Sequence, residues 1–302
     1  MEYSDALRQH GDLAFQVGAF RYLITRSAHD IVYTVSDGSR SIAAPLGWAF
    51  GAGEVGQTFV FERNGAYYES YLSYFSNLRG LDITPGHNRS GPTQLEGAAG
   101  RELFPSEASL CFGCHFSEST IRGQFDPRHA VPGVICEACH GPGEGHVTRM
   151  KLGQIDAGRK AVFNPARLDA VDSIDFCGAC HRTPWDVVQL GTPGVFNVRF
   201  QPYRLVKSRC WGKGDARLTC RACHDPHQPL VQDLAAYDGR CLACHARTEA
   251  SKSALGRRVA SCPVATRACV DCHMPKVEVA DMHAPYTDHY IRIVRHGQPY
   301  PD

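Results

Sequence analysis

The sequence predicts a small antiparallel β domain in residues 1–95, followed by a loop-rich domain of mainly short helices in residues 96–302. Two observations indicate this division. All fourteen cysteines of the 302-residue chain lie after residue 95, and none lies before it. The second part is also rich in glycine and proline, which interrupt helices and strands, so only short helical segments are expected there.

Two β-hairpins are expected in the first domain. Asp37-Gly38 and Asn64-Gly65 each stand between two strand-forming runs, and both dipeptides favour the tight turns that join antiparallel strands. The runs lie at 31–35 and 41–44, and at 58–62 and 66–71. Aromatic residues of this domain are expected to form the core of the sheet or to cover a bound group; they are Phe20, Tyr22, Phe59, Phe61, Tyr68 and Tyr71.

Six Cys-x-x-Cys-His motifs occupy the second domain. Cysteines at positions i and i+3 share one face of a short helix, where they can bond both vinyl groups of one porphyrin. The histidine that follows then binds the iron, whereas zinc ribbons need no histidine at this position. The cysteine pairs are Cys111 and Cys114, Cys136 and Cys139, Cys177 and Cys180, Cys220 and Cys223, Cys241 and Cys244, and Cys269 and Cys272. The predicted proximal ligands are His115, His140, His181, His224, His245 and His273.

The motifs therefore predict six covalently bound haem c groups. The stretch from Cys111 to His273 supplies only about 27 residues for each haem, too few for a conventional hydrophobic core. We expect the porphyrins to serve as the core of this domain, with short helices and loops around them.

Nine histidines lie outside the motifs, and the chain has only four methionines. Coordination by two histidines is therefore predicted for most irons, and it implies lower reduction potentials than histidine–methionine coordination. The expected distal ligands are His146, His227, His283, His289, His10 and His87. His129 and His296 are weaker candidates, and His29 is expected at the surface.

Two cysteines, Cys210 and Cys262, lie outside the motifs. A disulfide between them is expected in an oxidising compartment. The alternative is that one of the two thiolates ligates an iron.

Charge and hydropathy narrow the class of protein further. A formal net charge of +1 argues against a nucleic-acid-binding protein, and no apolar run approaches the roughly 18 residues that span a bilayer. Covalent haem attachment takes place outside the inner membrane, so a periplasmic or extracellular location is expected. An export signal is expected to have been removed or to lie upstream of Met1.

Several segments resemble a family of bacterial multihaem cytochromes c, and together they cover nearly the whole chain. The resemblance implies electron transfer but no particular partner. In similar proteins the histidine after Cys-His-Gly-Pro-Gly often ligates a neighbouring haem, which favours His146. The segments are 47–51 with 56–61, 136–143, 197–205, 220–227, 269–276 and 287–295.

The predicted function is electron transfer through six closely packed haems, with other redox proteins or further copies of the chain as partners. The chain is expected to act as a shuttle, as a subunit of a larger redox complex, or as the repeating unit of an extracellular filament. The alternative is a multihaem reductase of a nitrogen or sulfur oxyanion with one open iron. All six motifs end in histidine and no proton donor is evident, so an electron carrier is favoured and no catalytic residue is assigned.

Overall fold

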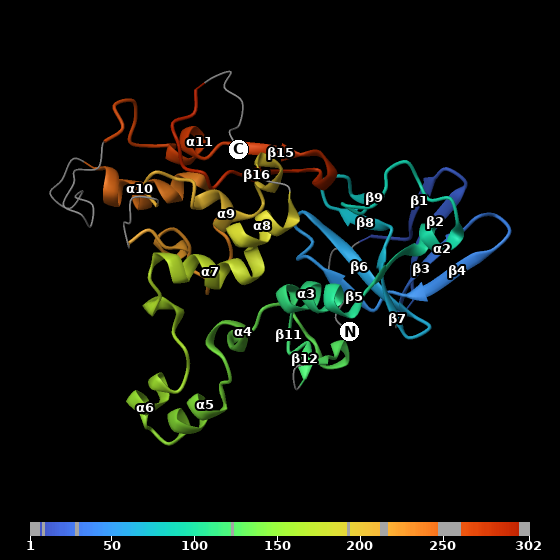
Figure 1. Ribbon diagram of the computed structural model, residues 1–302, viewed down its shortest axis with the longest axis horizontal. Coiled ribbons are helices and arrows are strands. Elements are labelled where there is room, and N and C mark those ends of the chain that lie inside the picture. The colour runs from blue at the N-terminus through green and yellow to red at the C-terminus, as the bar shows by residue number, and fades with distance from the viewer. Residues whose placement is uncertain are drawn as a thin grey trace. The chain divides into compact units, whose positions relative to one another are not determined.

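The computed structural model describes residues 7, 10–27, 30–121, 124–191, 194–211, 217–246 and 261–295 (Figure 1). These residues divide between two compact units. Unit 1 comprises residues 1–135 and 279–284, and unit 2 comprises residues 136–278 and 285–302. The predicted division at residue 95 is based on where the cysteines begin, whereas the two units are defined by how compactly the chain packs. The predicted division stays a prediction.

The first sheet of unit 1 is a four-stranded antiparallel meander. Its strands follow the chain in order and are β1 (Leu13–Val17), β2 (Phe20–Arg26), β3 (Ile31–Ser36) and β4 (Ser41–Pro45). The turn between β3 and β4 is the predicted one: Gly38 has a φ of 91°, and the Asp37 carboxylate accepts the backbone N–H groups of Ser39 and Arg40. The first predicted hairpin is confirmed.

The second sheet of unit 1 has six strands. They are β5 (Trp48–Phe50), β6 (Gly56–Arg63), β7 (Ala66–Ser70), β8 (Leu72–Phe75), β9 (Gly80–Ile83) and β10 (Gly100–Leu103). The hydrogen-bonded order is β10-β7-β6-β8-β9, and β5 also pairs with β6. Asn64 and Gly65 form a two-residue loop between β6 and β7 with φ of 51° and 79°, so the second predicted hairpin is also confirmed.

Unit 1 has a conventional hydrophobic core. Phe20, Tyr22, Phe59, Phe61 and Tyr71 belong to one buried cluster, and Tyr68 packs against it. A second cluster, around Phe50, Val60 and Phe112, packs helix α3 (Pro105–His115) against the sheet. Burial of these side chains stabilises the unit because each removes a large apolar area from water. The predicted role of the aromatic residues as core is confirmed.

The remaining elements of unit 1 are short. They are α2 (Leu95–Ala99), β11 (Phe116–Ser117), β12 (Thr120–Ile121), β13 (Gln124–Phe125), η1 (Pro127–His129), β14 (Val131–Pro132) and η7 (Ala280–Met282). Strands β11 and β14 pair, as do β12 and β13.

Unit 2 consists of short helices joined by loops (Figure 1). Its helices are α4 (Cys136–His140), α5 (Glu144–Lys151), α6 (Ile155–Lys160), η2 (Pro165–Arg167), α7 (Ala170–His181), α8 (Pro184–Leu190), η3 (Val195–Asn197), α9 (Gln201–Leu205), η4 (Cys220–Ala222), η5 (Leu234–Tyr237), α10 (Asp238–His245) and α11 (Cys269–His273). Strands β15 (Lys276–Val279) and β16 (Ala284–Thr287) form a two-stranded sheet. A β-rich part followed by a loop-rich part of short helices is the predicted order, and it is confirmed. None of the helices within the described ranges is both long and apolar enough to cross a bilayer.

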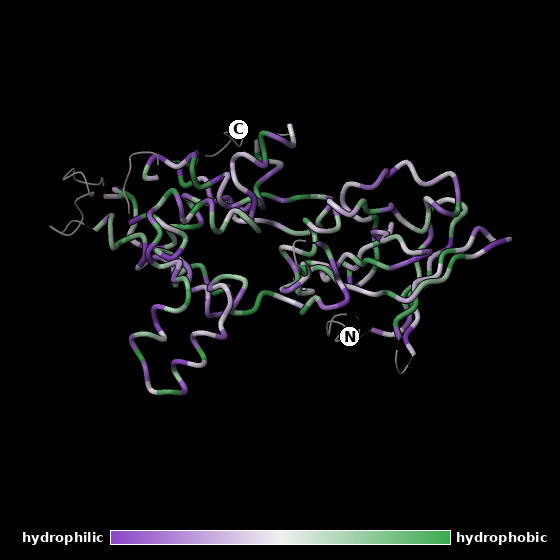
Figure 2. The backbone as a smooth tube through the Cα atoms, turned by 60° about the horizontal axis from the view of Figure 1, so that its bottom comes forward, coloured by the Kyte–Doolittle hydropathy of each residue, from purple (hydrophilic) through white to green (hydrophobic). Residues whose placement is uncertain are grey.

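Few hydrophobic side chains are buried in unit 2. Among its described residues they are Ile174, Val187, Val198, Tyr203, Leu205 and Val270. Other large apolar side chains of unit 2, such as Phe163, Trp185 and Val188, are exposed to solvent. Apolar residues also recur along this part of the chain (Figure 2). A unit of this size normally buries much more apolar surface. The described residues of unit 2 therefore lack most of the hydrophobic core that a unit of this size requires.

Candidate haem sites

All six Cys-x-x-Cys-His motifs lie on helical turns. The first and third end α3 and α7, the second and sixth form α4 and α11, and the fifth ends α10. The fourth begins in η4, where the His224 N–H donates to the Cys220 carbonyl at 3.0 Å. A helical turn places the two sulfurs of a motif on one face, which is the arrangement that attachment to one porphyrin requires.

Two of the predicted proximal histidines are oriented by backbone carbonyls. The Nδ1–H group of His140 donates to the Phe163 carbonyl at 2.8 Å, and that of His273 donates to the Arg292 carbonyl at 2.8 Å. A carbonyl oxygen can only accept, so the proton of each neutral ring is on Nδ1 and the lone pair is on Nε2. This tautomer leaves Nε2 available to bind iron.

Two of the predicted distal histidines are held in the same tautomer, with Nδ1 bonded to a backbone carbonyl. Nδ1 of His146 donates to the Gly158 carbonyl at 2.9 Å, and Nδ1 of His289 donates to the Thr287 carbonyl at 3.0 Å. Burial lowers the pKa of His289 to about 4, so its ring is neutral near pH 7. Both rings can present Nε2 as an iron ligand, and their role as distal ligands stays a prediction.

Three other predicted distal ligands use Nε2 within unit 1. Nε2 of His10 lies 2.6 Å from the Tyr74 hydroxyl, and Nε2 of His283 lies 2.7 Å from Oδ2 of Asp82. Nε2 of His87 lies 3.0 Å from Oε2 of Glu69. Each ring would have to exchange this bond for a bond to iron, and the three ligand assignments remain predictions.

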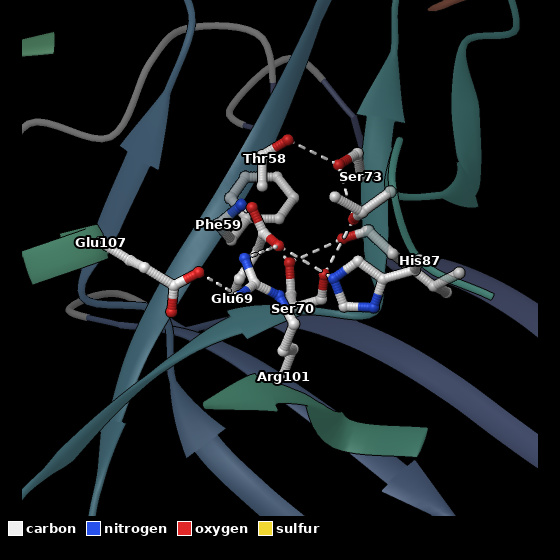
Figure 3. Close-up of polar contacts among 10 residues, drawn as sticks. Thr58, Phe59, Glu69, Ser70, Ser73, His87, Arg101 and Glu107 are labelled. Carbon is white, nitrogen blue, oxygen red and sulfur yellow. Dashed lines mark hydrogen bonds and ion pairs between the residues drawn. The ribbon is translucent and has the colours of Figure 1, made fainter. Parts of the chain in front are cut away.

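The contacts of His87 belong to a polar network that also holds the helix of the first motif (Figure 3). Arg101 donates to Glu69 at 3.2 Å and to Glu107 at 2.7 Å, and Glu107 lies in the first turn of α3. Sequence patterns did not indicate this network, because Glu69 and Arg101 are brought together by the pairing of β7 with β10.

Two pairs of histidine rings lie close together in unit 2. The centroids of the His140 and His227 rings are 6.0 Å apart and their planes differ by 6°. The centroids of the His224 and His289 rings are 6.2 Å apart, with an angle of 35° between the planes. The structure thus brings together members of the predicted proximal and distal sets.

Cysteines of the second, third and fourth motifs are neighbours. Burial and the adjacent Cys180 thiol raise the pKa of Cys139. A hydrogen bond with Cys220 and burial raise the pKa of Cys177 well above its usual range. Helix α7, which carries Cys177, packs against η4, which begins at Cys220. The third motif therefore lies beside both the second and the fourth.

Cysteines of the fourth, fifth and sixth motifs are neighbours as well. Burial and the nearby Cys241 thiol raise the pKa of Cys223 to about 11. The Cys241 thiol also forms a hydrogen bond with Cys269, and burial raises its pKa. Asp238 at the start of α10 accepts the backbone N–H groups of Ala268 and Cys269 at 2.8 and 2.9 Å. Sequence patterns did not indicate Asp238, which fixes the sixth motif relative to the fifth.

The cysteines outside the motifs correct one prediction. The predicted Cys210–Cys262 disulfide is wrong, because neither residue belongs to a disulfide in the structure. Cys210 is half-buried and lies close enough to Cys223 to contribute to its raised pKa. Cys262 is exposed, and backbone N–H groups of Val264 and Ala265 lower its pKa. His296, a weaker distal candidate, and His29, which is expected at the surface, both lie outside the described residues.

The residues of unit 2 fit covalently bound haem. Each motif provides two thiols for attachment, and the oriented histidines provide Nε2 for the iron. Few apolar side chains are buried among the described residues of this unit, so a porphyrin would supply apolar surface that the polypeptide lacks. Two buried polar atoms, Oε1 of Gln201 and Nε1 of Trp211, also have no hydrogen-bond partner among the described residues. A porphyrin offers both the apolar faces and the polar edge that such a region needs.

Comparisons with known proteins agree with this site. Residues 89–141, which contain the first two motifs, match the family described as cytochrome c554 and c-prime. The multiheme cytochrome MtrA of Shewanella baltica (strain OS185) is 23% identical over 208 residues, which cover 63% of this chain and 54% of that protein. The chain therefore spans about half the length of this relative. No solved structure matches the chain.

The motifs and their helical geometry define a c-type cytochrome with several haems. The family match over residues 89–141 and the similarity to a multiheme cytochrome support a bacterial multihaem cytochrome c family, electron transfer as the general function and covalently bound haem c as the cofactor.

Proposed function

We propose that the chain carries electrons through six closely packed haem c groups, most of them ligated by two histidines. The single observation that supports this best is the contact between cysteines of successive motifs. Each of these cysteines would be bonded to the edge of a porphyrin. Neighbouring thiols such as Cys177 and Cys220 therefore bring two porphyrin edges together.

The proposed path follows the motifs of unit 2. Cys139 lies near Cys180, which brings the second haem towards the third, and the hydrogen bond between Cys177 and Cys220 joins the third to the fourth. Cys241 then lies near Cys223 of the fourth motif and Cys269 of the sixth. Haem supplies an iron that changes oxidation state by one electron. The polypeptide supplies the short spacing between successive groups.

The side chains of the protein have three roles in this proposal. The paired cysteines hold each porphyrin, and the proximal histidines are held in the tautomer that offers Nε2. Distal histidines complete the coordination of iron, which leaves no position for a substrate and favours electron transfer over catalysis. The expected distal ligands are those predicted from the sequence: His146, His227, His283, His289, His10 and His87.

We place the protein outside the inner membrane, in the periplasm or beyond the cell, because haem c is attached there. Its partners are other redox proteins or further copies of the chain, within a larger redox complex or an extracellular filament. Similarity to a multiheme cytochrome supports a redox partner. Electron microscopy and size-exclusion chromatography of the purified protein distinguish a filament from a discrete complex or monomer.

Spectroscopy of the purified holo-protein tests this function. We expect six haems per chain from the pyridine haemochrome assay and intact mass, and a purely low-spin spectrum that nitrite, hydroxylamine and cyanide leave unchanged. Reduction and reoxidation should be complete and reversible. A five-coordinate, high-spin haem that binds nitrite would favour the reductase alternative, and a colourless chain without haem would contradict both.

A further inference from the structure

The segment His224-Asp225-Pro226-His227 carries two histidines that meet different partners. His227 lies against His140 of the second motif, and His224 lies against His289 near the C-terminal end of the described chain. Two imidazoles that bind one iron from opposite sides, with metal–nitrogen bonds of about 2 Å, have ring centroids about 6 Å apart. The observed separations of 6.0 and 6.2 Å match this spacing.

The ring nitrogens of the first pair are arranged for such binding. Nδ1 of His140 donates to the Phe163 carbonyl, and Nδ1 of His227 lies 3.4 Å from Oδ1 of Asp225. The same Asp225 oxygen accepts the backbone N–H of His227 at 3.0 Å, which fixes the turn. In both rings Nδ1 has a partner, and Nε2 has none among the described residues.

The second pair is positioned by the C-terminal segment. Nδ1 of His289 donates to the Thr287 carbonyl, so its Nε2 is available. The preceding residue, Asp288, is held by a buried ion pair with Arg204 of α9. The ring of His289 therefore has a fixed position beside His224.

We propose that His140 and His227 bind the iron of the second haem, and that His224 and His289 bind the iron of the fourth. The four-residue segment 224–227 then holds two irons, and the Cα atoms of its two ligands are at most roughly 10 Å apart. This inference rests on the proposed function, because it requires haem on the second and fourth motifs. It places the second haem close to the fourth, so that the second, third and fourth haems form one group.

The first experiment replaces one distal ligand in the full-length holo-protein. His227→Ala should convert one of the six haems from low-spin to high-spin, as measured by electron paramagnetic resonance at unchanged haem content. Added imidazole should restore the low-spin signal, which a purely structural role of His227 would not produce. Gln228→Ala is the matched control, because Gln228 is the exposed neighbour of His227 and has no imidazole to bind iron; we expect no spectral change.

The second experiment asks whether His227 and His289 serve different irons. His289→Ala should also produce one high-spin haem, and the double variant His227→Ala/His289→Ala should produce two. To identify the haem served by His227, the substitution is repeated in a Cys136→Ala/Cys139→Ala background that carries five haems. There His227→Ala should add no further high-spin signal, because its haem is already missing.

The outcomes separate this inference from the proposed function. Six low-spin haems in the wild type with no change in His227→Ala would overturn the pairing and leave electron transfer intact. One high-spin haem in the double variant, or an added signal in the five-haem background, would also overturn it. If the five-haem protein does not accumulate, the double variant still decides whether two irons are involved. Fewer haems or an open iron in the wild type would instead contradict the proposed function.

Discussion

Arg204 and Asp288 form a bidentate ion pair in which both side chains are fully buried. Nε and Nη2 of Arg204 each donate to a different carboxylate oxygen at 2.9 Å, and Arg292 adds a third contact at 2.7 Å. Two charges removed from water are stable only while each has its partner. The pair connects α9 to the C-terminal segment that carries His289.

Removal of one partner should therefore destabilise unit 2. We expect Asp288→Ala to lower the free energy of unfolding by about 3–5 kcal/mol, since Arg204 would remain buried without its carboxylate. Denaturant unfolding of the holo-protein, followed by circular dichroism, measures this change. Asp281→Ala is the control: its ion pair with Arg89 is exposed, and such pairs contribute about 0–1 kcal/mol. Equal effects of the two substitutions would contradict the importance of the buried pair.

Gly178, between the cysteines of the third motif, should not tolerate a side chain. A Cβ atom there would lie 2.5 Å from Cγ2 of Thr183 and 3.3 Å from its Cα. Thr183 cannot move freely, because its hydroxyl caps α8. We expect Gly178→Ala to cost about 1–3 kcal/mol of stability through overpacking.

Gly113, inside the first motif, provides the comparison for Gly178. A Cβ atom at Gly113 would have no neighbour within 4 Å among the described residues. Thermal unfolding of both alanine variants at equal haem content checks the difference. A loss of stability in Gly113→Ala as large as that in Gly178→Ala would show that the contact with Thr183 is not responsible.

Asp238 should be needed for attachment of the sixth haem. Its carboxylate accepts the N–H groups of Ala268 and Cys269, and those hydrogen bonds lower its pKa. Without it, the first turn of α11 loses its acceptor, so the Cys269–Cys272 pair is less well ordered for attachment. Intact mass spectrometry of Asp238→Ala should reveal a population with five haems. The control, Asp271→Ala, removes an exposed carboxylate within the same motif and should retain six.

Haem loading should make the protein acidic. The polypeptide has a formal net charge of +1, and twelve ionised propionates would bring the charge to about −11. Isoelectric focusing of the red holo-protein should place it well below the sequence value of about 7.6. A band at or above neutrality would mean that the propionates are neutralised or that fewer haems are attached.

The sequence predicted those features that depend on neighbouring residues. Asp37-Gly38 and Asn64-Gly65 specify their hairpins because positive φ is required within the turn itself. The motif helices were also predictable, since cysteine spacing and a helical turn share one periodicity. The predicted disulfide failed for the opposite reason: two unassigned cysteines in the sequence do not reveal whether their sulfur atoms meet.

The sequence by itself determined the class of protein, because the residues that attach a haem are five consecutive residues and this motif occurs six times. Only the tertiary structure decided which groups meet across long separations. Arg204 and Asp288 are 84 residues apart in sequence, and His140 and His227 are slightly farther apart, so no local pattern pairs them. Such contacts depend on how helices and loops pack, which is a property of the whole folded chain.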